Sequence, residues 1–388
     1  MRFYILILTL LTSMASFAQE GIHKQGTILP KIYRENLTYD IKDECILFNV
    51  EIEGKTYRFL LDTGAPTTIS DKIKGNFPFL KEEEITDAAT NTQKVNYVTI
   101  PEIKIGALTF KNFAVMYQDM SLFEKLQIDG IIGANIVSKS AWDFNLANKK
   151  ITISSTLDTK QVNNTFKKVK IQKTETGTPT LTLTYFNKIK EKNIYFDTGY
   201  NGFFYLSGTK FNELREAKLI SKYIEGNGIV SQSAFGTTEG ITYMTPLKMK
   251  LGEYNLPPFI SDVDEDEESN MGSQWLKYYH TILYKNHLYF KENKQPKIES
   301  SFKSLGITTS VINNELLVSF VWNNTNASAK GLKPKDKILS VNQKDTSILT
   351  TDELNLLKQE VKNLDKVTLE INTKGNFIEL TKDTILSI

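Results

Sequence analysis

The sequence predicts a mainly β protein with two related lobes followed by a small α+β module. Apolar residues alternate with polar ones over most of the chain, which is the period of half-buried strands. An Asp-Thr-Gly tripeptide occurs at 62–64 and again at 197–199, each inside a longer repeated pattern. Only one long amphipathic helix pattern stands out, at 350–364, close to the C-terminus.

Composition excludes several classes of protein. The chain has 388 residues, enough for two to three domains. Its 47 Lys+Arg and 45 Asp+Glu leave a net charge of +2, so the chain lacks the excess positive charge that nucleic-acid binding requires. A single cysteine, Cys45, cannot form an intramolecular disulfide, and the 3 histidines are scattered. We therefore expect no metal site, no cofactor and no nucleic-acid partner.

The first 18 residues have the pattern of a secretory signal peptide. Arg2 precedes an apolar run at 3–11, and Ser-Phe-Ala at 16–18 is a small-x-small cleavage site. The run is shorter than the ~20 residues that span a bilayer, and no later stretch is apolar enough to do so. We expect an exported protein, periplasmic or secreted, that is soluble after signal-peptide cleavage.

Strand pairs precede and follow the first Asp-Thr-Gly. Residues 46–52 and 57–61 form one predicted hairpin around Gly54, and residues 98–105 and 108–115 form another around Gly106. A shorter helix is predicted at 211–221.

The repeat has two parts in each copy. Phe-Leu-Leu-Asp-Thr-Gly-Ala at 59–65 recurs as Ile-Tyr-Phe-Asp-Thr-Gly-Tyr at 194–200. Ile-Ile-Gly at 131–133 ends 71 residues after Asp62, and Asn-Met-Gly at 270–272 ends 75 residues after Asp197. A closing hairpin follows each. One Asp-Thr-Gly is a weak signal, and it is also a common turn sequence, but the doubled two-part pattern is far more specific.

These motifs resemble the pepsin and retropepsin aspartic proteases, with two retropepsin-like lobes fused in one chain. The resemblance covers about residues 41–292 and implies the bilobal acid-protease β-barrel fold. It places lobe 1 at 41–157 and lobe 2 at 165–292, after an N-terminal extension at 19–40. The first copy matches well. The second departs from the family, because Tyr200 replaces a small residue and the 270–272 motif is degenerate.

The resemblance makes Asp62 and Asp197 the candidate catalytic dyad. Two carboxyl groups about 3 Å apart cannot both ionise, so one keeps a proton while the other activates a water. The resemblance also implies that the two threonines hydrogen-bond across the lobes and that the two glycines allow close backbone approach. The supporting loop residues are Thr63, Gly64, Ala65, Thr198 and Gly199.

This family covers its cleft with a mobile hairpin, called the flap, in the middle of a lobe. We expect the lobe 1 flap at 87–97, with a polar tip at 88–93, and the lobe 2 flap at 226–240. The alternative for the second segment is a flexible loop.

The C-terminal segment is similar to bacterial PDZ domains over about residues 300–388. The match is carried by Gly-Leu-Lys-Pro-Lys-Asp-Lys-Ile-Leu-Ser-Val-Asn at 331–342, followed by the helix and by a strand at 367–371. Thr350 and Glu353 form a capping box ahead of the helix. The resemblance makes Leu305, Gly306 and Ile307 the carboxylate-binding loop, where a peptide terminus adds as a strand. The alternative is a purely structural loop.

Taken together, the motifs predict an aspartic-type endopeptidase whose PDZ domain recruits polypeptide. Its expected partners are a polypeptide substrate and a peptide C-terminus. The alternative is a catalytically silent member of the family that binds peptides or assembles an envelope complex. A fused two-lobe chain needs no second copy to build its dyad, so we expect a monomer. No Gly-x-Ser-x-Gly pattern supports serine-hydrolase chemistry.

Overall fold

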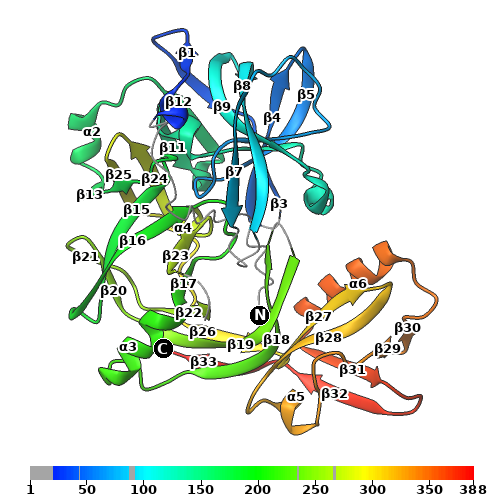
Figure 1. The fold of residues 1–388 in the computed structure, drawn as a ribbon. Helices are drawn as coiled ribbons and strands as arrows, with labels where there is room; N and C mark the ends of the chain where they lie inside the picture. Colours follow the sequence, from blue (N-terminus) through cyan, green and yellow to red (C-terminus); the bar gives the residue numbers. More distant parts are fainter. Residues whose placement is uncertain (1–20, 43, 87–91, 234–235, 265–267) are drawn as a thin grey trace.

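The computed structural model describes residues 21–388 except 43, 87–91, 234–235 and 265–267. The expected signal peptide at 1–18 lies outside the described residues, as does most of the expected tip of the first flap. Strands dominate the described part, in two lobes with a smaller module beside the second (Figure 1), so the predicted mainly β class is confirmed. Across the described residues, no helix combines the length and the apolar character needed to cross a membrane.

The first lobe is built on a nine-stranded sheet. The predicted hairpins at its centre are confirmed, and Gly54 supplies the positive φ of +73° in the first turn. In sheet order the strands are β1 (Thr27–Leu29), β9 (Leu108–Gln118), β6 (Thr68–Ser70), β10 (Gly130–Ile132), β5 (Lys55–Leu61), β4 (Cys45–Ile52), β8 (Thr92–Ile105) and β7 (Phe79–Thr86), with β3 (Asp40–Lys42) beside β4. Short helical turns accompany them: η1 (Ile22–Lys24) precedes β1, η2 (Ser121–Leu126) lies between β9 and β10, and α1 (Ala134–Val137) follows β10.

The second lobe repeats this plan in a twelve-stranded sheet that continues into the C-terminal module. Its strands in order are β21 (Tyr254–Asn255), β20 (Met249–Leu251), β15 (Pro179–Tyr185), β16 (Ile189–Asp197), β23 (Asn270–Gly272), β17 (Phe204–Ser207), β22 (Phe259–Asp264), β19 (Gly236–Leu247), β18 (Ile224–Ser233), β28 (Glu315–Trp322) and β27 (Ile307–Ile312), with β14 (Gln172–Lys173) beside β15. The helix predicted at 211–221 is α3 (Gly208–Glu216); it starts earlier because the Ser207 side chain caps it. A one-turn helix, α4 (Trp275–Tyr278), follows β23 as α1 follows β10.

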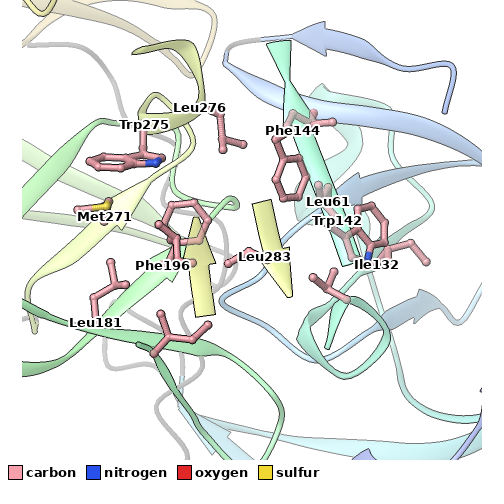
Figure 2. Packing of buried hydrophobic residues seen from close by; sticks show 14 of the residues in the cluster. Leu61, Ile132, Trp142, Phe144, Leu181, Phe196, Met271, Trp275, Leu276 and Leu283 are labelled. Carbon is pink, nitrogen blue, oxygen red and sulfur yellow. The ribbon is translucent and has the colours of Figure 1, made fainter. Parts of the chain in front are cut away.

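The closing hairpins of the two lobes form one six-stranded sheet. Its order is β13 (Lys167–Lys170), β25 (His287–Glu292), β24 (Tyr279–Tyr284), β11 (Ala141–Asn145), β12 (Lys150–Ser154) and β2 (Arg34–Leu37), with η3 (Leu146–Asn148) in the β11–β12 turn and α2 (Thr159–Asn163) before β13. Strands β11 and β24 pair across the lobe boundary, with Trp142 opposite Leu283. The buried core is therefore continuous from Trp142 and Phe144 of one lobe to Phe196 and Trp275 of the other (Figure 2).

Two strands lie upstream of the predicted first lobe, at 27–29 and 34–37. Strand β1 pairs with β9, and β2 adds to the edge of the shared sheet beside β12. Residues 27–37 of the expected 19–40 extension therefore contribute strands to two sheets, through pairings with segments distant in the sequence.

The C-terminal module contains helix α6 (Thr351–Asn363), whose predicted Thr350–Glu353 capping box is confirmed. Leu354, Leu357 and Val361 bury one face of this helix in the module's own core. The remaining elements are β26 (Ser301–Ser304), α5 (Asn326–Ala329), β29 (Ile338–Val341), β30 (Lys344–Asp345), β31 (Lys366–Ile371), β32 (Phe377–Thr381) and β33 (Asp383–Ser387).

A strand pairing joins this module to the second lobe. Strand β28 lies beside β18, which is one arm of the segment expected to be the second flap (Figure 1). In this pairing Gly228 is opposite Phe320. A Cβ on Gly228 would collide with the carbonyl oxygen of Ser319, and its φ is +134°. The backbone N–H of Asn323 also donates to the carbonyl of Glu225 at 2.8 Å. The glycines of this segment thus allow a close backbone-to-backbone joint.

Candidate active site

Each repeated aspartate lies at the end of a strand that is held by a parallel neighbour. In the first lobe β10 runs parallel to β5, with Ile132 opposite Leu61, and the N–H of Asp62 donates to the carbonyl of Ile132 at 3.0 Å. In the second lobe β23 runs parallel to β16, with Gly272 opposite Asp197. The two halves of each sequence repeat are therefore adjacent strands, and the aspartates are fixed where those strands end.

The two Asp-Thr-Gly loops are bonded to each other through their threonines. The N–H of Thr63 donates to Oγ1 of Thr198 at 3.0 Å, and the N–H of Thr198 donates to Oγ1 of Thr63 at 3.0 Å. Each hydroxyl then donates to a carbonyl of the opposite strand, Thr63 to Phe196 at 2.5 Å and Thr198 to Leu61 at 2.9 Å. All four bonds are buried. They join the loops into one rigid unit, as the resemblance led us to expect.

The glycines bring the loop backbones against the opposite aspartate. A Cβ on Gly64 would overlap the Asp197 carboxyl group, and a Cβ on Gly199 would overlap the Asp62 carboxyl group. The N–H of Gly64 donates to Oδ1 of Asp62 at 2.8 Å, and the N–H of Gly199 donates to Oδ1 of Asp197 at 2.8 Å. Ala65 adds a second donor to Asp62 Oδ1 at 3.1 Å. Glycine is thus required at 64 and 199 for space.

The two carboxyl groups lie within hydrogen-bonding distance of each other and have no exposed surface. Burial raises the pKa of Asp62 well above its usual range, and the neighbouring Asp197 raises it further. Burial also raises the pKa of Asp197, but hydrogen bonds from Asp62, Asn270 and the Gly199 backbone oppose the rise. Two carboxyl groups in contact resist ionising together, so the pair keeps one proton to higher pH than an isolated aspartate would.

The second copy departs from the family pattern at a residue that contacts the dyad. Asn270, the first residue of the degenerate Asn-Met-Gly motif, donates from Nδ2 to Oδ2 of Asp197 at 3.0 Å. Sequence reasoning noted the motif as degenerate and did not assign this residue a role. The sequence signal that could have indicated a role was the polar Asn270 at the position where the first copy of the motif has the apolar Ile131.

Tyr200 is accommodated by glycines around its ring. Its side chain is buried and packs edge-on against Tyr205, with ring centroids 4.9 Å apart. A Cβ on Gly202 would overlap the ring, and so would a Cβ on Gly272. The large residue after the second Asp-Thr-Gly therefore fills space that two glycines leave open, and the Asp197 loop keeps its geometry.

The hairpin that contains the expected first flap packs against the loop of Asp62. The hairpin β7–β8 starts at Phe79, earlier than the expected 87–97, and its side chains Ile85, Val95 and Tyr97 share a buried cluster with Ala65. Ile22 of η1 belongs to the same cluster. Its neighbour His23 meets the ring of Tyr97 edge-on, and burial, with a smaller effect from Lys81, lowers the His23 pKa to about 4. The expected second flap, 226–240, lies within the paired strands β18–β19.

The expected peptide loop of the C-terminal module is tightly held. Leu305 and Ile307 are buried, and Gly306 has a φ of +86°. The N–H of Gly306 donates to Oγ of Ser304 at 3.0 Å, and its carbonyl accepts the N–H of Trp322 at 2.9 Å. The N–H group of Gly306 is therefore already hydrogen-bonded within the protein, and the loop lies directly beside β28.

Comparison with known families agrees with both resemblances. Residues 48–136 match the aspartyl protease family model. Residues 295–372 match the PDZ domain family model. The predicted resemblance to aspartic proteases and PDZ domains is confirmed for these segments; the first match lies in the first lobe and includes Asp62.

Solved structures with a similar fold have a sequence identity of about a tenth to this chain. The basic 7S globulin from soybean is 10% identical over 67% of this chain and 95% of its own, with a TM-score of 0.41. Conglutin gamma from lupine seeds is 9% identical over 68% and 95%, with a TM-score of 0.44. The aspartic proteinase from Irpex lacteus is 10% identical over 68% and 98%, with a TM-score of 0.40. No curated protein shows significant sequence similarity to the chain.

Proposed function

We propose that this protein is an aspartic-type endopeptidase in which Asp62 and Asp197 activate one water against a peptide carbonyl. The observation that carries the proposal is the dyad itself. Two carboxyl groups from separate lobes lie within hydrogen-bonding distance, on loops joined by reciprocal threonine bonds. A structural turn does not need two buried carboxyl groups in contact, because their desolvation is unfavourable.

The proposed reaction uses both protonation states of the pair. Asp197, as carboxylate, takes a proton from water while the water oxygen attacks the peptide carbonyl carbon. Asp62, as carboxylic acid, gives its proton to the carbonyl oxygen, which yields a neutral tetrahedral diol. Proton transfer from one diol hydroxyl through the dyad to the nitrogen then breaks the C–N bond. The products are a carboxylic acid and an amine, and the dyad again holds one proton.

The substrate in this proposal is an extended polypeptide that the C-terminal module recruits. The PDZ match and the loop at Leu305–Ile307 support binding of a peptide C-terminus. Strand β27 is the last strand of its sheet among the described residues, and the peptide would pair with its outer edge as an added strand. The β28–β18 joint supports this arrangement, because it holds that loop one strand away from the second flap.

Export and a monomeric state belong to the same proposal. The 1–18 pattern supports delivery to the periplasm or the medium. Both aspartates come from one chain, so the site needs no partner subunit.

The test is hydrolysis by the purified chain lacking residues 1–18. We expect cleavage of denatured protein or of a peptide library within pH 3–8, and loss of cleavage in Asp62→Asn and in Asp197→Asn. Asp143→Asn is the matched control, because Asp143 bonds His280 at 2.6 Å in the shared sheet, outside the dyad. Full activity in either dyad variant would contradict the assignment.

A second candidate function is peptide binding without cleavage. The specific observation in its favour is that neither carboxyl group of the dyad has exposed surface, so substrate reaches it only after an opening. Absence of cleavage together with binding of the same peptides would support it.

A further inference from the structure

We propose that Asn270 is a positioning residue that assigns the dyad's single proton to Asp62 and keeps Asp197 as the ionised base. This inference rests on the proposed hydrolytic function and goes beyond it by giving the two aspartates unequal roles. The difference comes from one side chain in the less typical copy of the repeat.

The first step is the count of donors on each carboxyl group. Asp197 accepts the N–H of Gly199 on Oδ1 at 2.8 Å and the Nδ2 of Asn270 on Oδ2 at 3.0 Å, and the backbone of Tyr200 is its third donor, so both oxygens are bonded. Asp62 receives its N–H donors, from Gly64 and Ala65, on Oδ1 only. No described N–H group donates to Asp62 Oδ2, which is buried. Hydrogen bonds to a carboxylate favour its charged form, so the charge belongs on Asp197.

The second step is the equivalent position in the other lobe. Gly272 lies opposite Asp197, and Gly133 follows Ile132, whose carbonyl accepts the N–H of Asp62. Counting back two residues from each glycine places Ile131 where the second lobe has Asn270. Ile131 is buried and has no polar atom in its side chain. The difference between the two halves of the dyad is therefore built into the sequence.

The third step is the rigidity of the strand that carries the amide. Asn270 is buried and pairs with Tyr195 on one side and Tyr205 on the other. The hydroxyl of the preceding Ser269 accepts the N–H of Ser207 at 3.0 Å and donates to Glu191 at 2.9 Å. The strand that carries the amide is held in this way, so the Nδ2 donor is already placed beside Asp197 before the reaction, which is the condition for effective electrostatic stabilisation.

The test is the pH profile of kcat/KM for three variants. Asn270→Leu removes the donor, so the acid limb should move up by about one to two pH units, the size of a hydrogen bond to a charged group, while the basic limb stays in place. Asn270→Gln keeps a donor and should restore part of the shift. Ile131→Asn places an amide beside Asp62 and should move the basic limb down. Unchanged limbs in folded Asn270→Leu would overturn the proposal.

A second readout needs neither activity nor a variant. Carboxyl ¹³C NMR of the wild-type chain should show the Asp197 carboxyl ionising first as pH rises, with Asp62 keeping its proton to higher pH. Ionisation of Asp62 first would overturn the inference. If the wild type cleaves nothing but shows the expected order, the hydrolytic proposal fails and the role of Asn270 stands. If it cleaves and shows the reverse order, only the role of Asn270 fails.

Discussion

Replacement of Thr198 by valine tests whether the threonine bonds hold the two catalytic loops together. Valine has nearly the same shape but removes the hydroxyl, so packing is kept while two buried bonds are lost, from the N–H of Thr63 and to the carbonyl of Leu61. Each buried group left without a partner costs about 1–3 kcal/mol, so the free energy of unfolding should fall by about 2–6 kcal/mol.

The assay is urea unfolding of the purified chain combined with the peptidase rate. The loops also carry the dyad, so kcat should fall about 10- to 100-fold, the effect of misplacing catalytic groups by a fraction of an ångström. Thr152→Val is the matched control. Its buried hydroxyl makes one bond, to Asn36 at 2.9 Å in the shared sheet, and its loss should cost about 1 kcal/mol with kcat unchanged. Equal stability and equal kcat in Thr198→Val and wild type would refute the reasoning.

Three further predictions follow from burial and from close contacts. Burial raises the Asp197 pKa in the folded chain above its value in the unfolded chain, so ionising Asp197 at higher pH destabilises the fold. Asp197→Asn should therefore increase the free energy of unfolding at pH 7, and a value equal to that of the wild type would contradict this. The His23 pKa is lowered from 6.5 to about 4, so the free energy of unfolding should fall by up to about 3 kcal/mol as pH drops from 6.5 to 4. His23→Phe keeps an aromatic contact with Tyr97 and should reduce this pH dependence. The same pH dependence in the variant and the wild type would refute the prediction. Gly228→Val brings a side chain into the carbonyl of Ser319, so amides of β28 should exchange with deuterium faster, and unchanged exchange would show that the joint tolerates the side chain.

The parts of the site that the sequence predicted are those set by local pattern and by repetition. Asp62 and Asp197 could be paired because the same two-part motif occurs twice, and a fused pair of related lobes brings equivalent positions together. Helix α6 was predicted almost to the residue, since its apolar spacing and the Thr350–Glu353 capping box are local signals.

The parts that the sequence did not predict depend on contacts between distant segments. The bond from Asn270 to Asp197 spans 73 residues and forms because β23 lies beside β16. Likewise, nothing near Gly228 in the sequence indicates that its backbone meets Phe320 of another module. Such pairings depend on the whole fold, and a single sequence carries no local signal for them.

The most direct test of the dyad is a comparison of two ligands that differ only at the scissile position. One is a pepstatin-type peptide whose tetrahedral hydroxyl group mimics the diol, and the other is the same peptide with an ordinary amide bond. If Asp62 and Asp197 act as proposed, the hydroxyl compound should bind the wild-type chain at least ~100-fold more tightly, and Asp62→Asn should remove most of that preference. Equal affinity for the two peptides in the wild type would contradict catalysis by the dyad.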